Sequence, residues 1–352
     1  NKEQMEDMVR IWGKSGQFGR LDYVTCWYRK AVDYMADNSE IVTAFVSTNS
    51  ISQGEQVGIL WSDLLKRGMH IHFAHRTFQW SSEARGKAAV HCVIIGFSPL
   101  EVRRKFLFDY ETVTAEPHVK EAANINPYLV DAPTIILPAR TTPPTTIPQM
   151  KKGSQPTDGG HLILGTAERN ELLQNEPQAE KWIRPYMGGE DLISGQSRWC
   201  LWLKGISPEE LRKMPCVMHR ISLVREARLK SPTPSVREYA DNPTLFTQDR
   251  QPTSDYLGVP EVSSETRRFI PIAFLPSSTI ASNKIQMIVG ATKFHFGILS
   301  STMHMAWMRT VGGRLKSDYS YSPAVYNNFP WPPAITTKQR QDIESAAQAV
   351  LD

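Results

Sequence analysis

Cysteine is scarce in this sequence, and its spacing excludes the common metal-binding patterns. The 352 residues contain four cysteines, none of them in a Cys-x-x-Cys pair, so no zinc site is expected. Cys26 and Cys92 lie among apolar residues and are predicted to be buried free thiols, which suit a reducing compartment. The sequence therefore predicts a cytoplasmic protein without a metal centre.

Long hydrophobic runs and a strong excess of one charge are also lacking. The longest apolar candidate, residues 285–308, is interrupted by Lys293, His295 and His304, so neither a membrane span nor a signal peptide is expected. A net charge of +4 permits a nucleic-acid partner without requiring one. The hydrophobic content of 41% is typical of a folded protein, and the length predicts two domains.

No complete catalytic motif is present. The chain contains no Gly-x-Ser-x-Gly, no Gly-x-x-x-x-Gly-Lys-Ser/Thr, no His-Glu-x-x-His, and no glycine-rich loop after a predicted strand. Its nine histidines show no metal-ligand spacing beside a carboxylate. These absences exclude the common hydrolases, P-loop enzymes and zinc enzymes.

The first hundred residues alternate between helical and strand patterns. Apolar spacing predicts helices over residues 21–35 and 57–65, and short apolar runs predict strands over 41–46, 69–73 and 90–97. This order fits the C-terminal half of a doubly wound, Rossmann-like sheet that ends in an antiparallel hairpin. The fold class is therefore α/β in this part.

The chain changes character after Pro99. A proline-rich segment covers residues 137–148, and long loops separate the predicted helices and strands, which indicates an irregular α+β recognition domain. A final helix is expected from Thr337 to Asp352, with Thr336 and Gln339 as its capping box. Strand-like pieces occur at residues 134–137, 161–164, 199–203 and 269–274.

Two loops are expected beyond the strand ends, where doubly wound sheets bind ligands. They cover residues 47–50 and 75–80, and the second carries Arg76, Phe78 and Trp80. The two aromatic residues either pack over the sheet edge or stack on a base extruded from DNA. Arg76 is a candidate contact for the DNA backbone, although exposed arginines are usually only solvated.

Two further basic segments are candidate contacts for DNA phosphates. Lys151, Lys152 and Ser154 lie in a predicted loop that ends in a glycine pair, and Arg225 and Arg228 are predicted to share one helix face. A solvated basic surface is the alternative in both cases.

Four sequence strings together resemble the MmeI-like (type IIL) restriction-modification enzymes. They are VSTNSISQGEQVG, HFAHRTFQWSSEARGKAAVHCVIIGF, MKKGSQPTDGGHLIL and MHMAWMRTVGGRLKSDYSYSPAVYNNFPWP. In that family one polypeptide joins a nuclease, a γ-class adenine-N6 methyltransferase and a target recognition domain. The resemblance covers the chain essentially from end to end.

The resemblance implies a fragment of a longer enzyme. The S-adenosylmethionine loop and the catalytic Asp/Asn-Pro-Pro-Phe/Tyr motif of γ-class enzymes precede the region present here, and neither occurs in the sequence. By resemblance, residues 1–102 belong to the methyltransferase domain, 103–332 form the target recognition domain, and 333–352 begin a helical segment. Phe78 looks like the aromatic residue that holds the flipped adenine. The chain alone is expected to bind double-stranded DNA weakly and not to methylate it.

The segment that reads a base pair in this family resembles the one that follows Gly313. Here it carries Lys316 and Asp318, with Arg314 beside them as a backbone contact. Lys316 can only donate hydrogen bonds, which suits guanine, and Asp318 can only accept them, which suits the amino group of the paired cytosine. On an extended segment both side chains would point to one side. A surface Lys–Asp contact is the alternative, and Ser320 is too short for a base contact.

Two other functions fit parts of the sequence. A non-catalytic specificity subunit could dock on a separate methyltransferase or nuclease, but it would not need half of a doubly wound sheet. An RNA methyltransferase could share the first hundred residues, but A-form RNA hides the groove that Lys316 and Asp318 would read. The leading hypothesis is therefore the DNA-reading half of a fused enzyme. The rest of its methyltransferase domain is expected upstream in the same polypeptide, with or without a nuclease domain.

Overall fold

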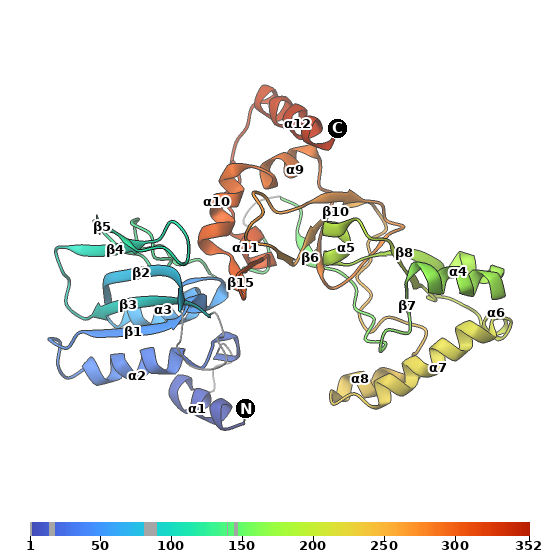
Figure 1. Cartoon of the computed structure of the whole chain (residues 1–352), viewed down its shortest axis with the longest axis horizontal. Helices are drawn as coiled ribbons and strands as arrows, with labels where there is room; N and C mark the ends of the chain where they lie inside the picture. Colours follow the sequence, from blue (N-terminus) through green and yellow to red (C-terminus); the bar gives the residue numbers. More distant parts are fainter. Residues whose placement is uncertain (1, 14–17, 81–89, 139, 144–146) are drawn as a thin grey trace. The chain divides into compact units, whose positions relative to one another are not determined.

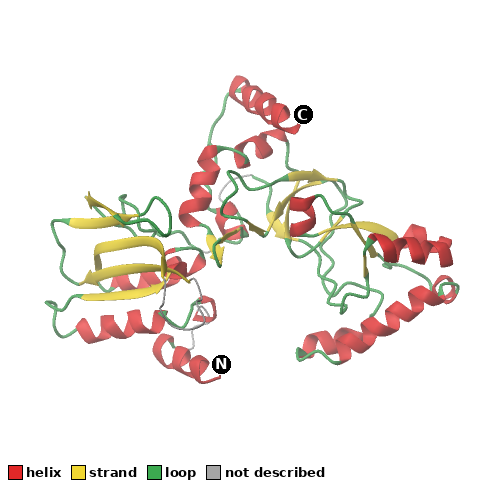
Figure 2. Ribbon diagram, in the orientation of Figure 1, coloured by secondary structure: helices red, strands yellow, loops and turns green. Residues whose placement is uncertain are grey.

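The computed structural model of the chain comprises two units (Figures 1 and 2). The first unit contains residues 1–141 and 306–320, and the second contains residues 142–305 and 321–352. The structure describes residues 2–13, 18–80, 90–138, 140–143 and 147–352.

The first unit is a mixed α/β unit. Its helices and short 3-10 helices are α1 (Lys2–Trp12), η1 (Phe18–Arg20), α2 (Thr25–Met35), η2 (Asn49–Ser52) and α3 (Glu55–Lys66). Its main strands are β1 (Thr43–Thr48), β2 (His70–Trp80), β3 (Val90–Ser98), β4 (Lys105–Asp109) and β5 (His118–Ala122). The hairpin strands β15 (Gly313–Leu315) and β16 (Asp318–Ser320) also belong to this unit.

The main sheet of the first unit has the strand order β1-β3-β2-β4-β5. Strand β3 pairs antiparallel with both β1 and β2, so β1 and β2 run parallel to each other. Strand β4 pairs parallel with β2 and antiparallel with β5. The element order from α2 to β3 agrees with the predicted order of helix, strand, helix, strand and strand.

Helices α2 and α3 pack on this sheet through an aromatic core. Tyr28 of α2 is fully buried, stacks on Phe97 of β3 with 5.5 Å between ring centroids, and contacts the edge of Trp61 from α3. Its hydroxyl shares a hydrogen bond of 2.8 Å with Ser47 Oγ. Because a buried tyrosine hydroxyl needs a partner, this bond fixes the end of β1 against α2.

The second unit contains two small sheets and most of the helices. The sheets have the orders β12-β10-β14-β6 and β13-β8-β9-β7. Its helices are α4 (Thr166–Asn175), η3 (Pro177–Trp182), α5 (Gly189–Ser194), α6 (Pro208–Arg212), α7 (Pro215–Leu229), α8 (Pro234–Glu238), η4 (Tyr239–Asp241), α9 (Lys293–Leu299), α11 (Pro323–Asn327) and α12 (Thr337–Leu351). Its strands are β6 (Met150–Lys152), β7 (Ile163–Leu164), β8 (Ile183–Met187), β9 (Arg198–Leu201), β10 (Tyr256–Pro260), β11 (Val262–Ser263), β12 (Ala273–Leu275), β13 (Ile280–Ala281) and β14 (Ile285–Val289).

Short elements and long connections give the second unit its irregular α+β character. One apolar core of this unit includes Val217, Ile221 and Val224 of α7, which pack with residues of β7 and β9. The expected capping box of α12 is present, since Thr336 Oγ1 accepts from the Gln339 amide at 3.2 Å. The strand expected over residues 134–137 is wrong, because that segment is irregular.

Helix α10 (Thr302–Val311) contains a buried histidine, His304, which should make the stability of the fold sensitive to acid. Burial lowers the pKa of His304 from its usual 6.5 to about 4, and its Nε2 shares a hydrogen bond of 2.8 Å with the Tyr321 hydroxyl. The folded state therefore favours the neutral imidazole. The contribution of His304 to the free energy of unfolding is fully present above pH 6.5 and is lost as the pH falls from 6.5 toward 4.

Lowering the pH from about 7.5 to about 5 should cost about 2 kcal/mol of unfolding free energy through His304. Urea unfolding at both pH values measures this difference. A His304→Gln variant keeps an amide beside the Tyr321 hydroxyl but cannot titrate, so its stability should change less with pH. An equal pH dependence in both proteins would contradict the assignment.

Within the described part of the chain, no helix has the length and apolar character needed to cross a membrane. In the same part, no group of three or more His, Cys, Asp or Glu side chains is arranged to hold a metal ion. Cys26 and Cys92 are buried free thiols, as predicted.

Candidate nucleic-acid interface

The segment expected as a loop at residues 75–80 is instead the end of a long strand. Strand β2 continues to Trp80, and Phe78 pairs with Cys92 of β3. The register shifts between His75 and Phe78, because three steps along β2 correspond to two steps along β3. This is a β-bulge, which inserts one extra residue and re-aims the side chains that follow.

The bulge brings His75 and Phe78 to one face of the sheet. Residues three apart on a regular strand point to opposite faces, but here the two rings lie 6.3 Å apart. His75 also stacks on Phe108 of β4, its partner across the strands, with 4.0 Å between centroids and 5° between planes. Phe78 lies 5.5 Å from Tyr110 in a stacked arrangement and 6.3 Å from Trp80. We call these five residues the aromatic cluster.

The aromatic cluster presents a partly exposed apolar surface. Phe78 is half-buried, and Trp80 is 46% exposed. His75 Nδ1 lies 2.7 Å from the Tyr110 hydroxyl, and burial lowers the pKa of His75, which favours the neutral ring. A neutral surface of this kind can stack against a planar heterocycle such as a nucleobase.

Sequence reasoning identified Phe78 and Trp80 but missed the other three members of the cluster. His75 was within the expected loop, but nothing in its spacing predicted the bulge. Phe108 and Tyr110 belong to β4 and the turn that follows it, which the sequence did not connect with β2. The parallel pairing of β2 with β4 is a long-range contact that local patterns do not encode.

Arg76 lies next to the aromatic cluster and is paired within the protein. Its Nη1 lies 3.0 and 3.1 Å from the two carboxylate oxygens of Asp109. Both side chains are substantially exposed, at 39% and 52%. An exposed ion pair contributes about 0–1 kcal/mol, so a phosphate can replace Asp109 at little cost.

The Lys151–Ser154 segment fits its predicted role only in part. Lys151 is exposed on β6, and Lys152 Nζ is paired with Glu261 at 2.7 Å. Ser154 is completely buried, and its Oγ accepts a hydrogen bond of 3.0 Å from the Arg250 amide. The structure contradicts the predicted phosphate contact of Ser154, because its hydroxyl cannot reach solvent.

Helix α7 separates the two arginines that were expected on one face. Arg225 is exposed, and its Nη2 lies 3.5 Å from Asp241. Arg228 is 1% exposed and donates to five backbone carbonyls. These acceptors are Thr157, Tyr239, Asn242, Pro156 and Leu245, at 2.7–3.3 Å.

A guanidinium has five N–H donors, so these bonds use all that Arg228 offers. The predicted phosphate contact of Arg228 is therefore wrong. The residue ties α7 to three surrounding segments from inside the protein. The prediction placed Arg228 on the exposed face because it lies three residues after Arg225. Residues i and i+3 on a helix differ by about 60° in direction, which is enough to separate a buried side chain from an exposed one.

The residues expected to read a base pair lie at the tip of a β-hairpin. Leu315 of β15 pairs with Asp318 of β16, and Lys316 and Ser317 form the two-residue turn between them. Lys316 has a positive φ of 57°, which is uncommon for a residue with a side chain. The expected extended segment is therefore wrong, although Lys316 is exposed beside Asp318 at the tip.

Arg314 stabilises this hairpin. Its guanidinium carbon lies 3.9 Å from the centre of the Tyr319 ring, and its Nη1 donates to the Ser317 carbonyl at 3.1 Å. Tyr319 is buried, so the cation covers an aromatic face from outside. A two-stranded ribbon of this kind has dimensions that the DNA major groove admits.

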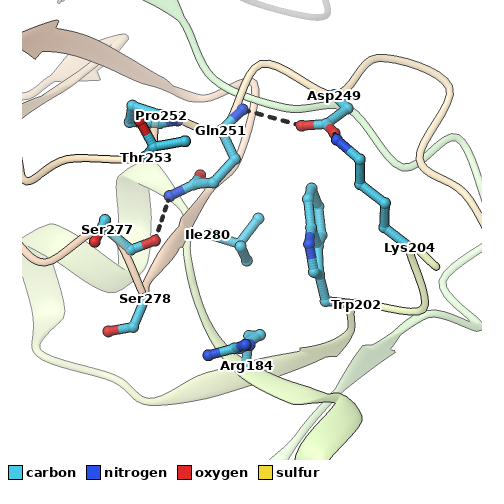
Figure 3. A pocket seen from close by; sticks show the side chains of 10 residues that line it. All are labelled: Arg184, Trp202, Lys204, Asp249, Gln251, Pro252, Thr253, Ser277, Ser278 and Ile280. Carbon is cyan, nitrogen blue, oxygen red and sulfur yellow. Dashed lines mark hydrogen bonds and ion pairs between the residues drawn. The ribbon is translucent and has the colours of Figure 1, made fainter. Parts of the chain in front are cut away.

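A pocket of about 420 Å³ lies elsewhere in the second unit (Figure 3). Trp202 forms one wall, and an ion pair of 2.6 Å joins Lys204 to Asp249. Gln251 donates to the carbonyls of Ser277 and Thr279. The side chains of Lys204, Asp249 and Gln251 are thus paired within the protein. None of the residues that line the pocket is one predicted to contact DNA. We assign no ligand to it.

Comparison with known proteins finds matches for two parts of the chain. Residues 1–109 match the family model of the MmeI DNA-methyltransferase domain, and residues 131–333 match that of the MmeI target recognition domain. A solved structure of the type IIL restriction-modification enzyme MmeI in complex with DNA matches with a TM-score of 0.95 and 47% identity. That match covers 100% of this chain and 47% of the MmeI chain.

A curated relative gives the same result. The chain is 38% identical over 354 aligned positions to a protein named DNA methyltransferase A of Bacillus subtilis (strain 168), covering 100% of this chain and 39% of the relative. The type IIG restriction endonuclease BpuSI matches with a TM-score of only 0.37 and 8% identity, too low to show a shared fold. The chain thus spans less than half the length of the relatives that it resembles.

These matches define the class of protein: a DNA methyltransferase domain joined to a domain that recognises a DNA target. The chain belongs to the MmeI family of type IIL restriction-modification enzymes. The resemblance found in the four sequence strings is confirmed.

Proposed function

We propose that this chain supplies target recognition and the second half of the methyltransferase fold in an enzyme that methylates adenine N6 in double-stranded DNA. The observation that carries the proposal is the joint match of residues 1–109 and 131–333 to the two MmeI domains. The methyltransferase match counts against a separate specificity subunit. The two matched ranges lie close to the proposed division into residues 1–102, 103–332 and 333–352, although the methyltransferase match extends to residue 109 and β4 pairs with β2.

The exposed edge of the main sheet supports the half-fold. Among the described strands, β1 has a neighbour on one side only, and Val46 on it is 49% exposed. Trp27 and Tyr34 on α2 are 54% and 74% exposed. An unpaired edge strand is a template for another strand. We propose that upstream strands of the same polypeptide pair with β1 and complete a Rossmann-like sheet.

The methyl donor of the parent enzyme would be S-adenosylmethionine, which supplies an electrophilic methyl group. We propose that the residues of this chain form only a part of its site, because the S-adenosylmethionine loop of the family is absent from the sequence. At the end of β1, Ser47 is bonded to Tyr28, Ser50 Oγ donates to Asp22 at 2.6 Å, and Asn49 is buried. Because these groups are paired within the protein or buried, we propose that most of the cofactor site lies upstream.

The residues of this chain would hold the DNA. The aromatic cluster would receive the extruded adenine, with Phe78 as its main stacking partner and Trp80 at the rim. Lys316 and Asp318 would read one G·C pair from the hairpin tip. Arg76, Lys151, Lys152, Arg225 and Arg314 are the remaining candidates for contacts to the DNA backbone.

The experiment that tests this function compares the full-length parent enzyme with this chain alone. Single-molecule sequencing of a plasmid treated with each protein and S-adenosylmethionine maps the methylated adenines. The full-length enzyme should methylate N6 at every copy of one sequence, and the chain alone should bind DNA weakly without methylating it. Methylation by the chain alone, or at another atom by the full-length enzyme, would overturn the proposal.

A further inference from the structure

The hairpin that carries Lys316 and Asp318 is part of the first unit, although it lies within the segment that matches the target recognition domain. Residues 306–320 group with residues 1–141. A backbone hydrogen bond joins the two parts of this unit, since the Gly54 amide donates to the Val311 carbonyl at 3.1 Å. Val311 ends α10 just before the hairpin begins at Gly313.

Gly54 occupies a backbone conformation that other residues rarely adopt. Its φ is 65° and its ψ is −153°, a region that is essentially restricted to glycine. It lies between η2 and α3 and directs its amide toward the end of α10. Any other residue here would favour a different backbone geometry and so weaken the bond to Val311.

Gly54 also approaches Gly313 so closely that a side chain on Gly54 would require the hairpin to shift. A Cβ on Gly54 would lie 3.3 Å from Gly313 Cα and 3.7 Å from Gly313 N. The first distance is tighter than ordinary van der Waals contact, so a side chain would push the hairpin by a few tenths of an ångström. The two glycines therefore form a direct backbone contact between the loop after β1 and the first residue of β15.

We infer that Gly54 is a positioning residue for sequence specificity, because it fixes the base-reading hairpin to the unit that holds the flipped base. This inference rests on the proposed function. Lys316 and Asp318 can discriminate a base pair only if their hydrogen bonds keep their geometry, and such sites need placement within about 0.5 Å. The Gly54–Gly313 contact sets the distance between the base that is read and the base that is methylated.

The test uses the full-length parent enzyme with Gly54→Ala. Values of kcat/KM are measured on three DNA duplexes: the cognate sequence, one changed at the base pair read by the hairpin, and one changed at a different pair. Discrimination at the hairpin's pair should fall about tenfold, since each good base contact contributes about that factor or more. Discrimination at the other pair should not change.

Gly68→Ala is the matched control. Gly68 lies at the other end of α3 and also has a positive φ, of 78°, but a Cβ there would meet nothing within 4 Å. It should therefore also lose thermal stability through strain at a positive φ, and it should keep full discrimination at both pairs. Equal effects of the two substitutions on discrimination would overturn the inference.

A second variant keeps the test open if Gly54→Ala does not fold. Gly313→Val leaves the Gly54 backbone unchanged but adds bulk at the same contact, where a Cβ alone would lie 3.9 Å from Gly54 Cα. It should lower discrimination at the same base pair. Unchanged discrimination in this variant would contradict the inference.

The double variant Lys316→Glu with Asp318→Arg identifies the pair that is read and separates the two proposals. If it leaves the methylated sequence unchanged, the hairpin does not read DNA and the proposed function of these residues fails. If it changes one position while Gly54→Ala and Gly313→Val keep full discrimination, only the positioning role of Gly54 fails.

Discussion

Replacing Arg228 with alanine is expected to lower the free energy of unfolding of the second unit by about 3–5 kcal/mol. The substitution removes a 1% exposed guanidinium that donates to five backbone carbonyls. The carbonyls of Tyr239 and Asn242 keep backbone donors at 3.1 Å, whereas those of Pro156, Thr157 and Leu245 lose the donor that Arg228 supplies. Each unsatisfied buried acceptor costs about 1–3 kcal/mol, and water entering the cavity would offset part of the sum. The loss is large because the hydrogen bonds of this one side chain hold α7 to three other segments of the chain.

Urea unfolding followed by tryptophan fluorescence measures this effect, and Arg225→Ala is its matched control. Arg225 lies three residues earlier on the same helix and is exposed beside Asp241, so its removal should cost less than about 1 kcal/mol. For DNA binding, Arg225→Ala should have the larger effect of the two variants. The slope of log affinity against log salt concentration should fall by about one, as expected for the loss of one phosphate contact. Equal stability of the two variants would show that Arg228 is not a structural residue.

Replacing Phe78 with alanine should lower kcat/KM for methyl transfer by the full-length enzyme by up to about a hundredfold. Stacking of one base on an aromatic side chain contributes about 1–3 kcal/mol, and Phe78 lies at the centre of the aromatic cluster, in contact with His75, Trp80 and Tyr110. The effect requires that the adenine leaves the double helix and stacks on this ring.

Steady-state methylation of an oligonucleotide with one target site measures the loss. Phe78→Tyr keeps the aromatic face and should retain activity within about threefold. With 2-aminopurine at the target position, Phe78→Ala should raise the fluorescence of the bound complex, because the extruded base loses its stacking partner. Unchanged rates and unchanged fluorescence would place the extruded base away from Phe78.

Local sequence patterns predicted the elements that depend on local spacing. The apolar positions of α2 and α3 and the capping box of α12 are set by residues within four positions of one another, and the structure contains all three helices. The strands β1 and β3 were predicted from their short apolar runs to within two residues, although β1 lies at the edge of the sheet and alternates exposed with more covered residues. The strings that resemble the MmeI family predicted both domains, which the comparisons confirm.

The site depends on long-range contacts that the sequence does not show. The bulge in β2 places His75 beside Phe78. It is visible only in the pairing of β2 with β3, whose register shifts by one residue between these two positions. The burial of Arg228 depends on carbonyls up to 72 positions away in sequence. The turn at Lys316 has a positive φ without a glycine to signal it, so a hairpin was read as an extended segment.

The central claim is that the hairpin tip reads DNA sequence for a methyltransferase, and one measurement tests it most directly. Methylated adenines are mapped by single-molecule sequencing after plasmid treatment with the full-length enzyme and with its Lys316→Glu, Asp318→Arg double variant. The exchange reverses donor and acceptor at the hairpin tip, so one position of the methylated sequence should switch from G to C while the other positions stay the same. Methylation that persists at the original sequence in the double variant would contradict the claim.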